Sequence, residues 1–158
     1  MNLKLLYAII LTLLPISELR IGLPVALSYA FETGTSIFLI FTLIVLLNIL
    51  IIFFVFWFLD NLHHLFLNIK PYKKGFNIFL KRFQKKVDKF EKRYDSLGFI
   101  ALALLVAIPL PGTGAWTGCL VAWLLGLERK KSIISISLGV LIAGLLILAG
   151  ALSFISFI

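Results

Sequence analysis

Charged residues are scarce in this 158-residue chain, and acidic residues are the scarcest. Seven Asp and Glu and fifteen Lys and Arg make up 14% of the sequence, against about 25% in an ordinary soluble domain. The single cysteine, Cys119, excludes a disulfide within the chain. Hydrophobic residues account for 61% of the sequence, a fraction that argues against a soluble enzyme and against a disordered chain. The single cysteine argues against a domain held together by disulfides.

Long uncharged runs take the place of the missing charges. Residues 36–59 and 132–158 contain no Asp, Glu, Lys or Arg, and about 20 apolar residues suffice for a helix to cross a bilayer. The sequence therefore predicts an all-α integral membrane protein with two long transmembrane helices in these ranges. Its length fits one membrane domain over residues 1–158.

Two further apolar blocks, residues 3–31 and 97–127, are interrupted near their centres by proline and glycine. Each block is left with two arms of about 12–14 residues, which are too short to cross a hydrocarbon core of about 30 Å in comfort. We expect each block to form a re-entrant helical hairpin, with a thin spanning hairpin as the alternative. Non-helical backbone at such a depth must be buried in protein or face a watery cavity.

The same order of segments occurs twice, as a hairpin and a span in residues 1–59 and again in residues 97–158. A hairpin returns to its starting side and one span crosses the membrane, so the second repeat is expected to be inverted relative to the first. Between them lies a basic linker, residues 60–96, with ten Lys or Arg and four acidic residues. Its apolar residues recur at steps of three and four, which predicts an amphipathic helix in the headgroup plane.

The distribution of positive charge indicates the sidedness of the chain. Short cytoplasmic loops of membrane proteins are rich in Lys and Arg. We therefore expect the linker 60–96 and residues 129–131 in the cytoplasm and both termini on the opposite side of the cell membrane. The same bias accounts for the formal net charge of +8 without a nucleic-acid partner, and membrane lipids are the partners that this multi-pass arrangement implies.

Glu18 and Arg20 lie at the tip of the first hairpin, and ionisable groups inside a membrane are costly and mark substrate or proton paths. Glu18 is the candidate proton-coupling residue, because a carboxyl group shielded from water exchanges a proton near neutral pH. Arg20 is a candidate substrate-binding residue, since its planar guanidinium suits phosphate or carboxylate. The alternatives are that both groups are solvated at an interface or that they pair with each other.

The tip of the second hairpin, residues 108–118, is rich in proline and glycine. Proline removes backbone donors, glycine allows close approach, and Thr113 is placed to cap a helix that begins near Ala115. The N-terminus of such a half-helix binds anionic groups in secondary transporters. A tight turn that serves only helix packing is the alternative. We expect substrate contacts from five residues of this tip: Pro111, Gly112, Thr113, Gly114 and Trp116.

Motifs for enzymatic chemistry are missing from the sequence. It contains no nucleotide-binding loop, no Ser-His-Asp order and no zinc signature. We therefore expect no enzyme activity, no cofactor and no metal site. Asn48, inside the first long span, is expected to make an interhelical hydrogen bond.

The two tips also carry a family resemblance. The segments Glu18-Leu19-Arg20 and 109–118 (PLPGTGAWTG) resemble the small multidrug export protein family, over essentially the whole chain. The paired hairpins are more distantly similar to the DedA/VTT superfamily, whose members have two inverted re-entrant hairpins and include proton-dependent translocases of lipid carriers. That resemblance implies an acidic residue in the first hairpin, which Glu18 fits, and arginines in the second, whose tip has none in this chain.

These patterns together predict a small proton-coupled transporter that works by alternating access. The expected substrate is an anionic lipid or a lipid phosphate such as a polyprenyl phosphate. Efflux of amphipathic cationic drugs and a non-transporting membrane scaffold are the alternative functions. We also expect a homodimer, because a chain of this length has a large lipid-facing perimeter relative to its core.

Overall fold

The computed structural model describes residues 3–15, 17–61, 97–109 and 113–156, and every regular element in these ranges is an α-helix. This confirms the all-α expectation for the described part of the chain. The helices, in chain order, are α1 (Leu3–Leu13), α2 (Glu18–Thr33), α3 (Ile37–Asn61), α6 (Leu97–Ala107), α7 (Ala115–Leu124) and α8 (Arg129–Ser156).

Two of these helices, α3 and α8, are long and apolar enough to cross a membrane. The sequence placed the two spans at residues 36–59 and 132–158, and α3 agrees with the first to within two residues. Helix α8 begins three residues earlier than expected, because the charged segment 129–131 forms its first turn. The backbone N–H of Ser132 donates to the carbonyl of Glu128, 2.9 Å away, as the helix starts.

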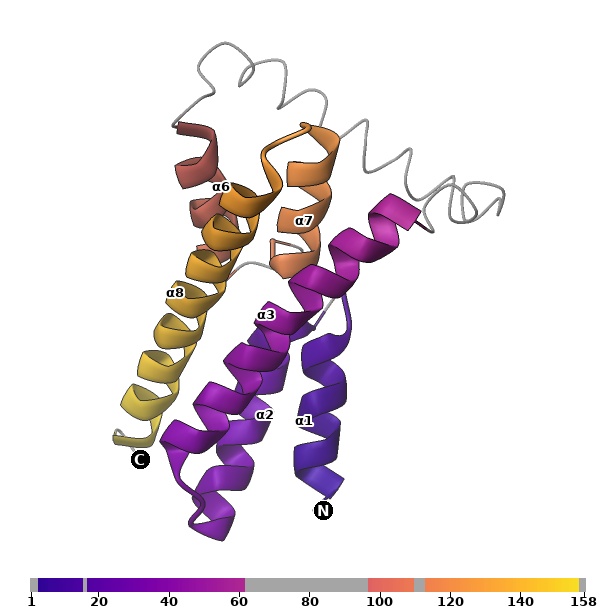
Figure 1. Cartoon of the computed structure of the whole chain (residues 1–158). Coiled ribbons are helices and arrows are strands. Elements are labelled where there is room, and N and C mark those ends of the chain that lie inside the picture. Colours follow the sequence, from indigo (N-terminus) through magenta and orange to yellow (C-terminus); the bar gives the residue numbers. More distant parts are fainter. Residues whose placement is uncertain (1–2, 16, 62–96, 110–112, 157–158) are drawn as a thin grey trace.

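The short helices form two hairpins that open at opposite ends of the molecule (Figure 1). Helices α1 and α2 lie at the end where α8 finishes, whereas α6 and α7 lie at the end where α3 finishes. The tips of both hairpins meet about midway along α3 and α8. The two broken blocks of the sequence, residues 3–31 and 97–127, are therefore the two hairpins. The linker helix expected within residues 60–96 falls almost wholly outside the described residues.

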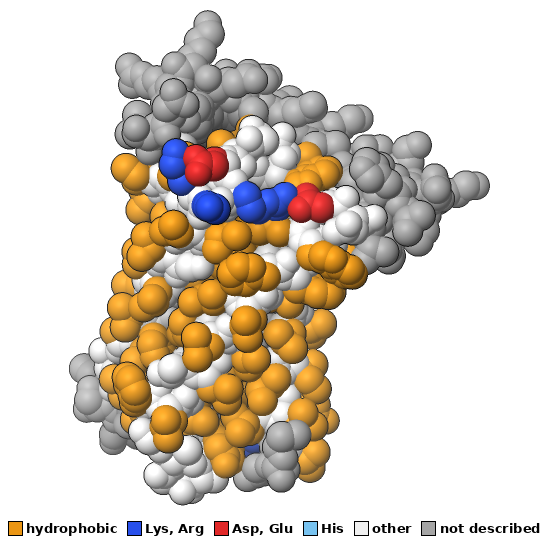
Figure 2. Space-filling model, in the orientation of Figure 1, with side chains coloured by type: hydrophobic (Ala, Val, Ile, Leu, Met, Phe, Trp, Pro, Cys, Tyr) orange, Lys and Arg blue, Asp and Glu red, His pale blue; other side chains and the backbone are white. Residues whose placement is uncertain are grey.

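Apolar side chains fill the interior and also cover the outside. Leu23, Ile44, Ile52 and Ile136 are among the largest side chains that are fully buried where the helices meet. Large hydrophobic side chains are equally common on the surface, and the side chain of Phe38 is 74% exposed. Figure 2 shows hydrophobic groups over most of the visible face, with Lys, Arg, Asp and Glu gathered in a band near one end. Such an exterior suits lipid, because monomeric soluble proteins rarely expose apolar patches of this extent.

A close contact between α6 and α8 depends on a glycine. A Cβ atom added to Gly139 would lie 2.6 Å from the carbonyl oxygen of Ala103 and 2.7 Å from Cβ of Val106. We expect Gly139→Ala to lower the free energy of unfolding by about 1–3 kcal/mol, because backbone of α6 must move to admit the methyl group. Thermal unfolding in detergent measures this loss.

The matched control is Gly150→Ala in the same helix, where an added Cβ meets no atom within 4 Å. That substitution should leave stability unchanged or raise it by up to about 1 kcal/mol, since alanine is the better helix former. Equal melting temperatures for the two variants would show that α6 and α8 do not pack as described.

Candidate functional site

Side chains satisfy the backbone groups that the break between α1 and α2 leaves open. The hydroxyl of Ser17 donates to the carbonyl of Leu11 at 2.6 Å. The amide of Asn48, from α3, donates to the carbonyl of Thr12 at 3.2 Å, and this bond confirms the expected interhelical role of Asn48. The last carbonyls of a helix have no partner within it, so these side chains hold the end of α1 in place.

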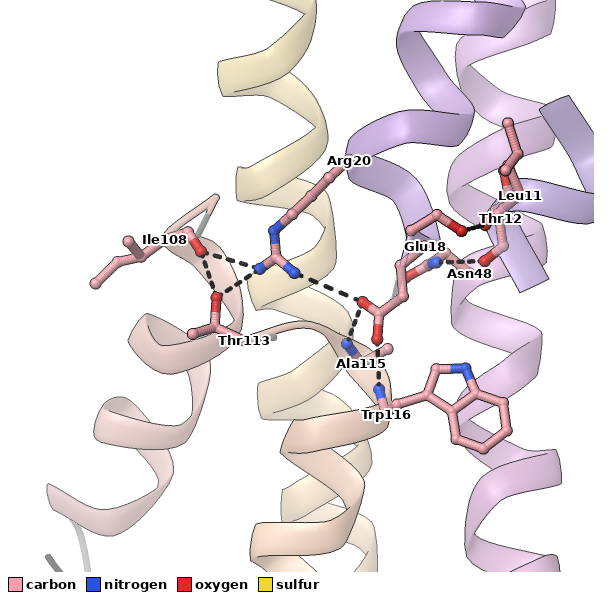
Figure 3. Close-up of polar contacts among 10 residues, drawn as sticks. Leu11, Thr12, Glu18, Arg20, Asn48, Ile108, Thr113, Ala115 and Trp116 are labelled. Carbon is pink, nitrogen blue, oxygen red and sulfur yellow. Dashed lines mark hydrogen bonds and ion pairs between the residues drawn. The ribbon is translucent and has the colours of Figure 1, made fainter. Parts of the chain in front are cut away.

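Glu18 is the first residue of α2 and lies in a strained backbone conformation. Its φ of 44° is the one positive value at a non-glycine position among the described residues. Such a conformation costs of order 1 kcal/mol and persists where surrounding contacts hold it. The contacts in this case come from the other hairpin (Figure 3).

The Glu18 carboxylate caps the N-terminus of α7. The backbone N–H of Ala115 donates to Oε2 at 2.9 Å, and the backbone N–H of Trp116 donates to Oε1 at 3.1 Å. Gly114 is the N-cap residue of α7 and makes no side-chain capping bond. The first N–H groups of a helix lack partners within it, and the helix dipole favours a negative charge at this position. Glu18 supplies both the acceptors and the charge from 97 residues away in sequence.

Arg20 bridges the two hairpins on the other side of this carboxylate. Its Nη1 lies 3.8 Å from Oε2 of Glu18, and its Nη2 donates to the carbonyl of Ile108 at 3.0 Å and to Oγ1 of Thr113 at 2.7 Å. The hydroxyl of Thr113 donates in turn to the same Ile108 carbonyl at 2.8 Å. Nε of Arg20 is buried and has no hydrogen-bond partner among the described residues. We call this set the tip cluster: Glu18, Arg20, Ile108, Thr113, Ala115 and Trp116.

The burial of Glu18 and Arg20 distinguishes the two alternatives left by the sequence, solvation at an interface and pairing with each other. Their side chains are 4% and 12% exposed, so solvation at an interface is wrong and the two groups pair inside the molecule. A cavity of about 10 Å³ adjoins them and Asn48, which is room for about one water molecule. Its other walls include Val140 and Ala143 of α8.

A glycine makes the cap possible. A Cβ atom added to Gly114 would fall on the carboxylate of Glu18. Any other residue at this position would therefore push the carboxylate away from the α7 N-terminus. Glycine is needed at Gly114 for close approach, as the composition of the second tip suggested.

The termini of four helices meet at the tip cluster. Helices α2 and α7 begin there and each contributes roughly +0.5 charge, whereas α1 and α6 end there and each contributes roughly −0.5. These partial charges offset one another, and the guanidinium of Arg20 balances an ionised Glu18. The cluster is therefore close to neutral as it stands, and the charge of Arg20 is left without a counter-ion when Glu18 is protonated.

The structure brings together most of the residues that the sequence singled out. Thr113 and Gly114 lie against Glu18 and Arg20, and Trp116 takes part through its backbone N–H. The indole Nε1 of Trp116 is buried with no hydrogen-bond partner among the described residues. Thr113 is not the helix cap that was expected, because its hydroxyl bonds to Ile108 and Arg20. Two further candidates, Pro111 and Gly112, lie outside the described residues.

The sequence did not predict the hydrogen-bonding roles of two side chains, Ser17 and Glu18. Ser17 was not expected to hold the end of α1, although a serine at a helix break is a known local signal for such a bond. That Glu18 caps α7 had no local signal at all, since the partners lie in different hairpins. The available signal was chemical, because a lone acid and a half-helix N-terminus inside one membrane domain are natural partners.

Comparisons with known proteins identify the family. The sequence model of a family described as "Putative small multi-drug export protein" matches residues 18–146, a range that begins at Glu18 and contains the whole tip cluster. No curated protein and no solved structure matches the chain. The family match covers well over half of the sequence, and the two long apolar helices agree with its membrane character. The chain is a membrane protein that belongs to the small multi-drug export protein family.

Proposed function

We propose that the protein is a proton-coupled transporter in which two re-entrant hairpins of an inverted repeat meet inside the bilayer. The observation that carries this proposal is the capping of α7 by Glu18, a buried acid that joins the two hairpins by two hydrogen bonds. The hairpins open at opposite ends of the molecule, as an inverted repeat requires (Figure 1). In this proposal the end with residues 129–131 is cytoplasmic, because positive charge marks that side.

Proton binding to Glu18 is the proposed coupling step. The ionised carboxylate accepts two N–H bonds and faces Arg20, whereas a protonated carboxyl group loses its charge and part of its acceptor capacity. Among the described residues around it, Arg20 is the other charged group, and the thiol of Cys119 lies one turn further along α7. A proton therefore weakens the contact between the hairpins and frees the N-terminus of α7.

An anionic substrate matches the charge that this step leaves. With Glu18 protonated, Arg20 has no counter-ion, and the freed N-terminus of α7 lies beside it. A phosphate group matches both the helix N-terminus and the guanidinium. The apolar exterior around the tips, where Ile108 is 49% exposed, suits a substrate with a hydrocarbon tail. We therefore propose an anionic lipid or a lipid phosphate, such as a polyprenyl phosphate, carried by alternating access of the two halves.

Efflux of amphipathic cationic drugs is the second candidate function, and the description of the family favours it. A cation would bind to the Glu18 carboxylate after the acid had left α7, and a proton would displace the cation. In the contacts that exist now, a cation would meet Arg20 and a helix N-terminus, which repel it. The sign of the substrate charge therefore separates the two functions.

Substrate-dependent proton movement in proteoliposomes tests the proposal. We expect farnesyl phosphate, a short polyprenyl phosphate, to move protons through the unaltered protein, and we expect Glu18→Gln to abolish this movement. Glu32→Gln is the matched control, because Glu32 lies on the same helix but is exposed and pairs with Lys4. Proton movement with tetraphenylphosphonium instead would favour cation efflux. If neither compound causes proton movement through folded and inserted protein, the result would favour a membrane scaffold.

A further inference from the structure

A second polar cluster joins the ends of three helices at the charged end of the molecule. Oδ1 of Asp60, near the end of α3, accepts a hydrogen bond of 3.0 Å from Nε1 of Trp123, near the end of α7. Nη2 of Arg129, the first residue of α8, lies 2.7 Å from each carboxylate oxygen of Asp60. The guanidinium carbon of Arg129 also lies 4.1 Å above the ring centre of Phe56. We call these four residues the end cluster.

The end cluster ties the same two halves together as the tip cluster does. Helix α7 is held at its N-terminus by Glu18 of α2 and near its C-terminus by Asp60 of α3. Both acids come from the first half of the chain, and α7 belongs to the second half. Between the two contact points Cys119 is fully buried, and its Sγ lies 3.8 Å from the carbonyl of Ile52 in α3.

Toward the start of α3 the two halves are joined differently. There Gly144, just past the middle of α8, packs on α3, and a Cβ atom added to this glycine would lie 3.2 Å from both Phe41 and Val45. These three residues carry no polar side-chain atoms, so they can slide apart without loss of a hydrogen bond. Separation of the helices at the end cluster, in contrast, breaks the hydrogen bond between Asp60 and Trp123 and the ion pair between Asp60 and Arg129.

We infer that the end cluster is the gate that closes the transport path on the side of residues 129–131. This inference rests on the alternating access proposed above and adds its regulation. Proton binding to Glu18 releases the N-terminus of α7, and breakage of the Asp60 contacts then releases its other end. Both carboxylate oxygens of Asp60 contact the same Nη2 of Arg129, and the pair is only half-buried, so it can exchange its partners for water when it opens.

The single cysteine of the chain reports on this gate directly. We expect Cys119 in the unaltered protein to react slowly with N-ethylmaleimide, because α3 covers it. Asp60→Asn removes the ion pair and should speed the labelling up to about fivefold in proteoliposomes, the usual size of the effect of a half-exposed pair. Glu128→Gln is the matched control: it removes the 2.6 Å pair between Glu128 and Lys131 at the same end, which joins no two helices, so the labelling rate should not change.

A second reporter separates gate opening from unfolding. Ala30 is 1% exposed and lies near the C-terminal end of α2, a helix that runs from the tip cluster toward the other end of the molecule (Figure 1). In a Cys119→Ala/Ala30→Cys background, Asp60→Asn should leave labelling slow if only the gate opens, whereas global unfolding exposes both positions. Exchange of the two charges, Asp60→Arg with Arg129→Asp, restores the ion pair but not the hydrogen bond from Trp123, because arginine has no acceptor. The exchange should therefore slow the labelling of Cys119 again in part.

Each outcome bears on the gate without any transport assay. Faster labelling of Cys119 alone, partly reversed by the charge exchange, supports the gate even if Glu18→Gln leaves proton movement intact. Unchanged labelling of Cys119 in folded Asp60→Asn protein would overturn the gate, and the proposed function would stand apart from it. Equal acceleration at both reporter positions would also overturn it, because the pair would then hold the fold as a whole.

Discussion

At neutral pH the Glu18→Gln protein should bind farnesyl phosphate about tenfold or more tightly than the unaltered protein. A glutamine has no negative charge and offers one acceptor oxygen where the carboxylate offers two. The α7 N-terminus, which Glu18 now occupies through Ala115 and Trp116, is then open to an external anion. Titration calorimetry in detergent measures the change in affinity.

The pH dependence of this binding has a definite sign. A proton on Glu18 removes the competitor for the α7 N-terminus, so the affinity of the unaltered protein for the anion rises as the pH falls, by up to about tenfold per pH unit. Glu18→Gln should abolish that dependence, apart from the titration of the phosphate itself. Glu32→Gln, which alters an exposed acid paired with Lys4, should retain it. An affinity that falls or stays constant in Glu18→Gln would show that carboxylate and substrate do not compete.

The second large effect is expected at the arginine of the tip cluster. Arg20→Ala should weaken binding of farnesyl phosphate by roughly 30- to 1,000-fold, the usual result of truncating one partner of a buried charge pair. Arg20→Lys should recover only part of the loss, because an ammonium group cannot face Glu18, Thr113 and Ile108 together as the guanidinium does. Equilibrium binding to each variant gives the ratio.

Loss of stability must be separated from loss of binding in that experiment. Arg20→Ala leaves the buried carboxylate of Glu18 unpaired, which is costly in itself. The double variant Glu18→Gln/Arg20→Ala has no unpaired charge, so its melting temperature should recover while anion binding stays weak. If this double variant binds farnesyl phosphate as tightly as Glu18→Gln does, Arg20 does not contact the substrate.

Hydropathy was sufficient to predict the helices of the fold, but it did not predict the contact between the two hairpin tips. The spans at 36–59 and 132–158 and the broken blocks at 3–31 and 97–127 correspond to α3, α8 and the two hairpins. These features depend on local sequence, because apolar length and helix breakers act within a few turns. The start of α8 was missed since the charges of residues 129–131 indicated a loop, although charged residues also fit a first helical turn at an interface.

The contacts between the halves could not be predicted in the same way. Glu18 and Arg20 were singled out because charge inside a membrane is costly, and both do lie in the tip cluster. Their partners on the second hairpin follow only from the three-dimensional arrangement of α2 and α7. The charges of Asp60 and Arg129 entered only the count that indicated the sidedness of the chain. The contacts of Asp60 with Trp123 and Arg129 depend on where α3 and α7 end and where α8 begins.

The central claim is that an anionic substrate takes the place of the Glu18 carboxylate at the α7 N-terminus, and proton uptake on binding tests it most directly. Calorimetric titration of farnesyl phosphate in buffers of different ionisation enthalpy counts the protons that binding consumes. The account predicts that the unaltered protein takes up about one proton more per bound anion than Glu18→Gln does near neutral pH. Equal proton uptake by the two proteins, with binding intact, would contradict it.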